Sequence, residues 1–385
     1  MRLLHTGDWH VGRSIRGRSR MDEFAAALGT VVEVAETEGC DAVLVAGDVY
    51  DQRAVTPDAD AVIFETFIKL FERNIGVVCI PGNHDSAARL AAFAPLLARV
   101  GTSVVPRVLP PDAGALVEVP ARDGSESALV ACLPFVSPRR FSDAASLFED
   151  MTAGYVNFDS NMGVLMASYE RHFRRDRVNV LMGHLFVGGA KPSGSERQVT
   201  IGAEYAVSPQ RLPATASYVA LGHIHRAQKV AGAPSETRYC GSLLQLDFGE
   251  AGQDKSVTVV EARPGLPPRA GQVAVEAGRR LVTVTATLDT LDKVAGDAGD
   301  AYLTVNLRVD QPVPGLADRV RAALPNALDV RLVLPQPEEA EARPSLRGLD
   351  PKQQFLQYYE AAHGAPPVDE LVIAFETVYE EVTAP

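Results

Sequence analysis

One local pattern recurs five times along this chain: a short apolar run, then a glycine, then side chains with carboxylate, amide or imidazole groups. The fullest example is Pro81 to Asp85, which follows the apolar run Val77 to Ile80. An apolar run of this length predicts a buried strand, and the proline and glycine predict a turn at its end. Each occurrence therefore places polar side chains directly after a strand.

The side chains placed in this way are Asp8, His10, Asp48, Asn83, His184, His223 and His225. Between the first strands lie segments with apolar residues at helical spacing, from Met21 to Glu38 and from Asp58 to Arg73. Strands that alternate with helices predict an α/β fold with a mainly parallel, covered sheet. Ligands of such sheets collect beyond the carboxyl ends of the strands, so we expect the seven side chains to converge there.

Each cluster also has an ordinary structural explanation. Asp8 and His10 lie two residues apart, so their side chains point to the same side of an extended segment. Taken alone, the pair suits a turn aspartate and a packed histidine better than a metal site. His184, His223 and His225 each suit a structural role in the same way. Their shared position after a strand and a glycine favours one common site.

The donor set indicates which chemistry such a site can perform. Seven oxygen and nitrogen donors without a thiolate are too many for one metal ion with an open position, but they suit two. Asp48 is the natural bridge because a carboxylate has two oxygens, and mixed donors of this kind favour Mn, Fe or Zn. Two ions roughly 3.5–4 Å apart can clamp the attacking and leaving oxygens of a phosphoester. His84 is then free to protonate the leaving alkoxide or to stabilise charge on the phosphorane, and Asp85 could fix its tautomer.

Composition restricts the setting. A chain of 385 residues predicts two or three domains, and no apolar run is long enough to span a bilayer. The first residues lead straight into the Asp8 cluster, so we expect no signal peptide. The four cysteines stand far apart, without a CxxC pair, so we expect reduced thiols in a cytoplasmic protein.

The formal net charge of −12 argues against broad nonspecific binding to DNA, but it permits a local basic groove. The candidates for phosphate contact are Arg13, Arg16, Arg18, Arg139 and Arg140. A solvated loop is the alternative explanation for the first three. The polar stretch from Gly188 to Glu196 suits either a mobile lid or a plain surface loop.

We divide the chain into four parts. Residues 1–268 form the domain with the polar clusters, residues 269–335 a small α/β domain, residues 336–349 a linker, and residues 350–385 two helices. The linker follows from its proline, glutamate and alanine content. The terminal helices carry large apolar stripes that must be buried, either on a partner's helices or back on the first domain.

The polar clusters, taken in order, resemble those of the calcineurin-like metallophosphoesterase superfamily: Asp-x-His, Gly-Asp-x-x-Asp, Gly-Asn-His-Asp, Gly-His and Gly-His-x-His. The blocks His5 to His10, Ala46 to Asp51, Ala220 to Gln228 and Arg238 to Ser242 are similar to its SbcD branch, the nuclease subunits of bacterial SbcCD complexes. The protein-phosphatase branch fits less well, because it has Asp-Arg-Gly where Asp51-Gln52-Arg53 stands. One departure is Leu243, where the SbcD branch usually has proline.

This resemblance implies a β-sandwich core flanked by helices, with a small capping domain and C-terminal helices. It implies one metal ion, Mn²⁺, on Asp8, His10, Asp48 and His225, and a second on Asp48, Asn83, His184 and His223. His84 would be the catalytic histidine. The implied activity is 3′→5′ double-strand exonuclease and hairpin-opening endonuclease in DNA recombination, replication and repair. The implied partners are DNA, a coiled-coil ATPase of the SbcC type and a second copy of the chain, and the implied place is the cytoplasm at the nucleoid.

Two other functions remain open at this stage. A stand-alone phosphodiesterase for small molecules would share the site, but it would not need a linker and docking helices. A non-catalytic scaffold of the same fold would not need the full set of metal-binding side chains.

Overall fold

The computed structural model describes residues 1–137, 158–202, 205–334 and 350–383. The chain divides into two compact units, Met1–Val333 and Leu334–Pro385. The predicted linker of residues 336–349 lies outside the described residues, as do Arg139 and Arg140.

The first unit contains a six-stranded sheet that includes the strands leading to the first three polar clusters. In spatial order it consists of β14 (Arg269–Ala274), β13 (Ser256–Glu261), β1 (Arg2–Thr6), β2 (Ala42–Val45), β3 (Gly76–Cys79) and β4 (Thr102–Val104). Strands β1 to β4 are parallel, as predicted, and β13 and β14 extend the sheet in antiparallel fashion.

A second six-stranded sheet contains the strands that lead to the histidine clusters. Its spatial order is β11 (Gln228–Lys229), β12 (Thr237–Tyr239), β10 (Tyr218–Gly222), β7 (Val178–His184), β6 (Ser127–Leu133) and β5 (Leu116–Pro120). Strands β12, β10, β7 and β6 are parallel. A separate two-residue pairing joins β8 (Phe186–Val187) to β9 (Ala206–Val207).

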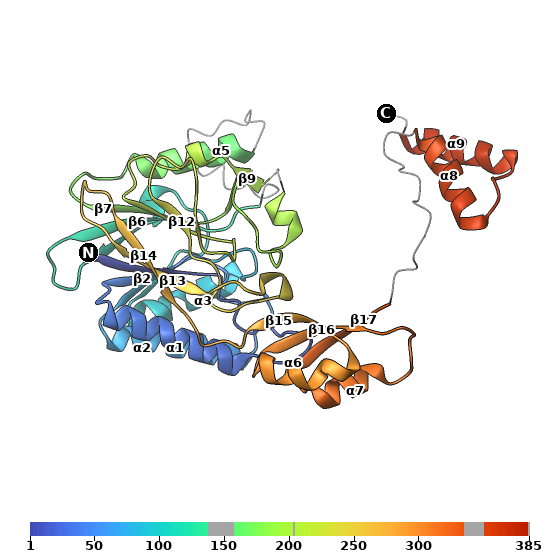
Figure 1. Ribbon diagram of the computed structural model, residues 1–385. Coiled ribbons are helices and arrows are strands. Elements are labelled where there is room, and N and C mark those ends of the chain that lie inside the picture. The colour runs from blue at the N-terminus through green and yellow to red at the C-terminus, as the bar shows by residue number, and fades with distance from the viewer. Residues whose placement is uncertain (138–157, 203–204, 335–349, 384–385) are drawn as a thin grey trace. The chain divides into compact units, whose positions relative to one another are not determined.

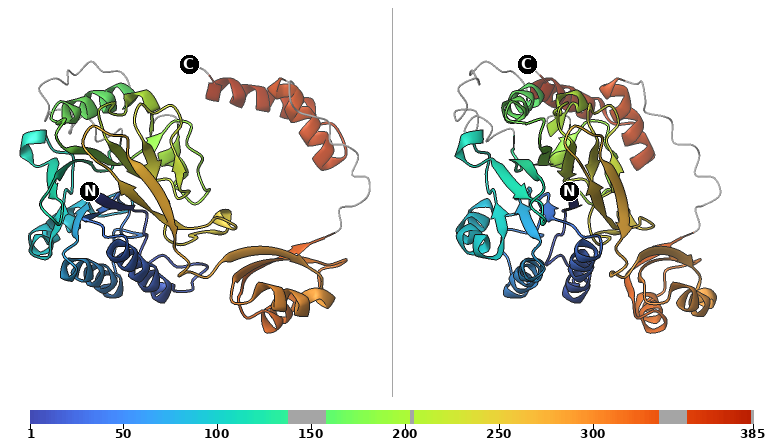
Figure 2. Two further views of the ribbon diagram at one scale, coloured as in Figure 1. Left: turned by 60° about the vertical axis from the view of Figure 1, so that its left-hand side comes forward. Right: turned by 90° about the vertical axis from the view of Figure 1, so that its left-hand side faces the viewer.

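The two sheets pack face to face and are covered by helices on their outer sides (Figures 1 and 2). Leu44 and Ile80 of the first sheet share a buried core with Val180 and Ala220 of the second. The outer face of the first sheet is covered by α1 (Met21–Thr37), α2 (Pro57–Glu72) and α3 (Ala87–Leu97), and that of the second by α5 (Phe158–Glu170). This arrangement confirms the α/β fold with a β-sandwich core.

Helix α2 shows how the sequence produces these covering layers. The Thr56 side chain accepts a hydrogen bond from the Ala59 amide, and Pro57 occupies the first helical turn, so both start signals are present. The apolar residues at helical spacing then bury Ile63 and Phe67 against the sheet.

The small domain has three parallel strands, β15 (Leu281–Ala286), β16 (Tyr302–Arg308) and β17 (Ala327–Val333). Helices α6 (Leu291–Ala298) and α7 (Leu316–Ala323) pack on one face of these strands (Figure 1). The sequence suggested a boundary at residue 268, but β14 pairs with β13 along its whole length and so belongs to the first sheet. The proline-rich stretch before it is a hairpin connection in which Gly265 has a φ of 70°.

The second unit contains α8 (Pro351–His363) and α9 (Asp369–Thr383). Asp350 caps α8 by accepting from the Gln353 amide, and the rings of Phe355 and Phe375 stack with centroids 4.4 Å apart. This contact leaves Tyr358 and Val378 mainly exposed, at 66% and 58%. Across the residues that the structure describes, no helix combines the length and apolar character that crossing a bilayer requires.

Candidate metal centre

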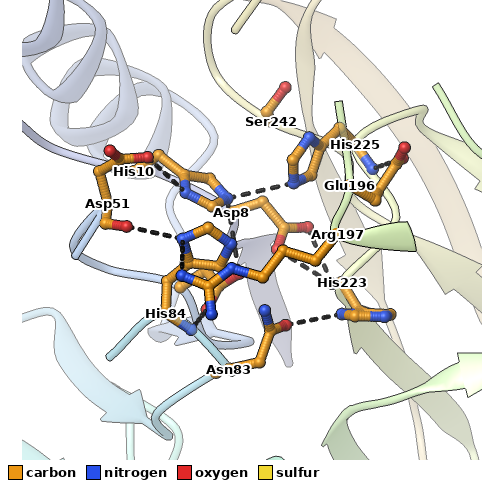
Figure 3. Close-up of polar contacts among 12 residues, drawn as sticks. Asp8, His10, Asp51, Asn83, His84, Glu196, Arg197, His223, His225 and Ser242 are labelled. Carbon is orange, nitrogen blue, oxygen red and sulfur yellow. Dashed lines mark hydrogen bonds and ion pairs between the residues drawn. The ribbon is translucent and has the colours of Figure 1, made fainter. Parts of the chain in front are cut away.

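The turns that follow β1, β2 and β3 meet those that follow β7 and β10 at one edge of the two sheets (Figure 3). Strands β7 and β10 pair so that His184 lies beside Gly222, which brings the two histidine clusters together. The side chains gathered there are Asp8, His10, Asp48, Asn83, His184, His223 and His225, all of them buried. The convergence expected from the strand-end pattern is therefore present.

The backbone at this edge is held in unusual conformations. Asp8, His10 and Asp48 have φ values of 49°, 50° and 49°, and His223 has a φ of 102°. Residues other than glycine rarely adopt positive φ values. Backbone strain of this kind is concentrated at functional sites. Gly82 is required for a different reason, because a Cβ there would overlap the Asp48 carboxylate.

His184, His223 and Asn83 form one group of donors. Nδ1 of His184 lies 2.8 Å from the Ala46 carbonyl oxygen, and Nε2 of His223 lies 3.1 Å from that of Thr200. Since a carbonyl only accepts, these nitrogens carry the protons and the other nitrogen of each ring has a lone pair. The two lone pairs face Oδ1 of Asn83 at 3.0 and 2.9 Å, so atoms that carry lone pairs are turned toward one another.

His10 and His225 form the second group together with Asp8. Nε2 of His10 lies 3.1 Å from Nε2 of His225. Nδ1 of His225 faces the Glu250 carboxylate at 3.1 Å, and Nδ1 of His10 faces the Asp51 carboxylate at 3.4 Å, so each ring directs its Nε2 lone pair at the other. A proton on one of these nitrogens, or a metal cation between them, would make this contact favourable.

Asp48 lies between the two groups. Its Oδ2 is 3.5 Å from Nε2 of His10 and also 3.5 Å from Nε2 of His184. Its other oxygen, Oδ1, accepts a hydrogen bond from the His84 amide at 2.8 Å. One carboxylate oxygen is thus shared by both donor groups, which is the arrangement that a bridging ligand requires.

Burial sets the protonation of the site. It lowers the pKa of His10 to about 4 and that of His223 to about 3, so both rings are neutral near pH 7 and can act as ligands. Burial also raises the pKa of Asp8 well above its usual range. It opposes ionisation of Asp48 as well, but the surrounding histidines outweigh it and lower the pKa of Asp48.

These observations fit divalent cations. The donors are neutral imidazoles, carboxylates and an amide oxygen, the mixture that first-row divalent metals accept. In three of the four histidines, the ring nitrogen that points away from the donor group lies 2.8 to 3.1 Å from a carbonyl or carboxylate oxygen. In His10 the corresponding nitrogen, Nδ1, lies 3.4 Å from the Asp51 carboxylate. Such partners orient histidine ligands at metal sites.

His84 and Asp85 are placed differently from what we expected. The Asp85 carboxylate does not contact the His84 ring; it accepts hydrogen bonds from the amides of Val49, Tyr50 and Gly82 at 2.8 to 3.1 Å. The expectation that Asp85 fixes the tautomer of His84 is therefore wrong. Nδ1 of His84 lies 2.6 Å from the backbone carbonyl oxygen of Asp51, which fixes the ring. Asp85 ties the turn after β3 to the turn after β2, and thus positions Asn83 and His84.

Sequence reasoning missed a buried network behind His225. The Glu250 carboxylate accepts a hydrogen bond from Lys255 at 2.6 Å and faces the His225 ring. Burial raises the pKa of Glu250, but His225 and Lys255 outweigh this effect and lower it. Burial lowers the pKa of His225, but Glu250 and Asp8 outweigh it and raise that pKa. Glu250 and Lys255 lie five residues apart in an irregular segment, so no periodic pattern marks them.

The arginines after His10 make contacts within the protein. Arg13 pairs with Asp51 at 3.1 Å and donates to the Leu246 carbonyl oxygen. Arg16 lies 3.5 Å from the Asp329 carboxylate, and the Arg18 guanidinium lies over the Tyr302 ring. This loop therefore contacts the small domain, and phosphate contact by these arginines stays a prediction.

Leu243 stands in this loop where the SbcD branch usually has proline. Its side chain is buried in the core beneath the first sheet. The Ser242 amide donates to the His225 carbonyl oxygen at 3.1 Å, so the loop is joined to the histidine cluster.

Comparisons with known proteins agree with this geometry. Residues 1–227 match the calcineurin-like phosphoesterase family, and residues 277–363 match the type 5 capsule protein repressor C-terminal domain. The chain is 32% identical to SbcD, the D component of nuclease SbcCD, of Bacillus subtilis over 384 residues, which is 97% of each chain.

Two further relatives carry the same name. The chain is 31% identical to SbcD of Escherichia coli K12, covering 87% of this chain and 84% of that one. It is 32% identical to SbcD of Rhodobacter capsulatus, covering 88% and 89%. The chain therefore belongs to the calcineurin-like phosphoesterases and, within them, to the SbcD family of SbcCD nuclease components, which are metal-dependent nucleases.

Proposed function

We propose that this chain hydrolyses DNA phosphodiester bonds with two Mn²⁺ ions. The observation that carries the proposal is the position of Asp48, whose Oδ2 is 3.5 Å from one histidine of each donor group. Asp8, His10 and His225 would hold one ion, and Asn83, His184 and His223 the other, with Asp48 shared. When bound, such a pair of ions lowers the pKa of a water molecule and neutralises charge on the phosphate.

The remaining chemistry falls to His84. Its Nδ1 is held by the Asp51 carbonyl oxygen, so its Nε2 is the nitrogen that can exchange a proton with the substrate. In the proposed reaction this nitrogen delivers a proton to the leaving alkoxide. General acid catalysis of this kind typically contributes about 10²–10⁴-fold.

We further propose 3′→5′ exonuclease action on duplex ends and endonuclease action on hairpins, in DNA recombination, replication and repair. The four cysteines are free and buried, which fits a reducing compartment, so the proposed place of action is the cytoplasm at the nucleoid. The exposed Ile68 and Phe71 on α2, at 43% and 48%, support self-association of two nuclease subunits through this helix.

The proposed partner is an SbcC-type ATPase, as the name of the relatives suggests. The exposed apolar side chains of α8 and α9 support docking through the terminal helices. A partner's helix would bury Tyr358 and Val378, which the contact between α8 and α9 leaves exposed.

The test starts from metal-free protein, to which Mn²⁺ is returned stepwise. We expect two bound ions per chain, and release of nucleotides from the 3′ end of a labelled duplex only when both are bound. Asp48→Asn is the isosteric control and should not cleave. Full activity with one ion, or faster hydrolysis of small phosphodiesters than of DNA at saturating substrate, would contradict the proposal.

A further inference from the structure

Arg197 brings a positive charge into the centre from the side of His223 (Figure 3). Its Nη2 lies 3.5 Å from Nδ1 of His84. That nitrogen already faces the Asp51 carbonyl oxygen at 2.6 Å and so carries a proton, which means that it offers the guanidinium no lone pair. The guanidinium is therefore adjacent to the predicted proton donor while its own hydrogens stay available.

The backbone on both sides of Arg197 is anchored to the metal centre. The buried Glu196 carboxylate accepts from the amides of Ser193 and Gly194 and, at 3.0 Å, from the amide of His225. The Arg197 carbonyl oxygen accepts from the amide and the hydroxyl of Thr200, whose own carbonyl oxygen faces His223. Contacts to the backbone of one predicted metal ligand and to the ring of another thus also hold the backbone at Arg197.

Within the described part of the chain, no ion pair includes Arg197. Arg13, at the same centre, is paired with Asp51 at 3.1 Å. The Arg197 side chain is exposed to solvent, so its guanidinium can meet an anion that enters the centre. A guanidinium presents a planar set of donors that matches two phosphate oxygens, so a phosphate is the anion that fits here.

We propose that Arg197 is a catalytic residue that binds the non-bridging oxygens of the scissile phosphate and stabilises the negative charge that builds up on them during hydrolysis. The inference rests on the proposed phosphodiesterase function. It adds a group from the loop between β8 and β9, a region to which the strand-end pattern assigned no role.

Two weaker roles must be separated from this one. Arg197 would act as a positioning residue if it only held His84, and as a general DNA contact if it only attracted the phosphate backbone. The small diester bis(p-nitrophenyl) phosphate distinguishes them. Its leaving group departs without a proton, so it does not need His84, and it has no flanking backbone to attract.

The experiment compares the full chain with Arg197→Ala, Arg197→Lys and His84→Ala, with Mn²⁺ bound and its content measured in each. Arg175→Ala is the charge-matched control, because Arg175 is exposed and lies before the opposite end of β7. We expect Arg197→Ala to lower kcat about 10²-fold on both the small diester and DNA, at unchanged Mn²⁺ content. Arg197→Lys should recover part of the rate, and Arg175→Ala should match the unmodified chain.

Two results would overturn the inference. If Arg197→Ala loses activity on DNA but not on the small diester, as expected for His84→Ala, then Arg197 does not bind the reacting phosphate. If it weakens DNA binding without lowering kcat, it is a general DNA contact. If the unmodified chain shows no Mn²⁺-dependent hydrolysis of either substrate, the proposed function fails instead, so the two failures are distinguishable.

Discussion

The backbone carbonyl oxygen of Asp51 lies 2.6 Å from Nδ1 of His84 and leaves the opposite ring nitrogen for the substrate. The hydrogen bond from His84 to Asp48 comes from its backbone amide, and the ring is held by the Asp51 carbonyl oxygen, so we expect removal of the ring to leave both metal sites intact. We expect His84→Ala to keep two Mn²⁺ ions and to lose cleavage of DNA by about 10²–10⁴-fold. Metal analysis and single-turnover cleavage measure the two quantities.

The exposed His172 provides the control, since His172→Ala removes the same ring from outside the centre. It should cleave at the unmodified rate. If His84→Ala lost one of the two ions, His84 would be a ligand and not the proton donor.

Asp48 and His225 should respond differently to removal. Asp48 contacts a histidine of each donor group, whereas His225 belongs to one group, with Asp8 and His10. We therefore expect Asp48→Ala to weaken both ions and His225→Ala to weaken mainly one. Titration of metal-free protein with Mn²⁺ gives the number of ions and their affinities. Equal metal content in the two variants would rule out the shared position of Asp48.

The positions of the seven converging side chains could be predicted because each follows a strand, and strand ends have a fixed place in a mainly parallel sheet. The contacts between the loops could not be predicted in this way. Asp85 is adjacent to His84 in sequence, yet it bonds to amides of another turn, and a carbonyl of that turn orients His84. Backbone acceptors have no sequence signal, so only the fold reveals them.

The same limit explains the misplaced domain boundary. Pro264 to Pro268 has the composition of a linker, but the residues after it pair with β13. Only six residues make up β14, and four of them are exposed, so the alternation that would mark a strand is weak. Turn composition alone does not distinguish a hairpin from a boundary between domains.

The contact between Glu250 and Lys255 should contribute both to stability and to metal affinity. Glu250→Gln would leave the Lys255 ammonium buried without its carboxylate, which we expect to cost about 3–5 kcal/mol of unfolding free energy. It would also remove the carboxylate that orients His225, which we expect to weaken binding of one ion about 10–100-fold. Urea denaturation of metal-free protein and Mn²⁺ titration measure these effects.

The double variant Glu250→Gln/Lys255→Met separates the two roles. It removes the unpaired charge, so stability should largely return while the metal affinity stays low. Unchanged affinity in both variants would show that Glu250 is needed only for packing.

The terminal helices provide the last prediction. Val378 lies on α9 and is 58% exposed, although the stacked rings of Phe355 and Phe375 already bury the face between the helices. Leaving apolar surface in water costs roughly 25 cal/mol for each Å², so we expect a partner to cover this side chain. Val378→Asp should therefore reduce co-purification with an SbcC-type ATPase, while Mn²⁺ content and cleavage of simple DNA ends stay unchanged. Thr377→Asp adds the same charge at the neighbouring exposed position and should bind the partner normally. If Val378→Asp instead lowered the melting temperature of the isolated chain and left the complex intact, α9 would belong to the chain's own core.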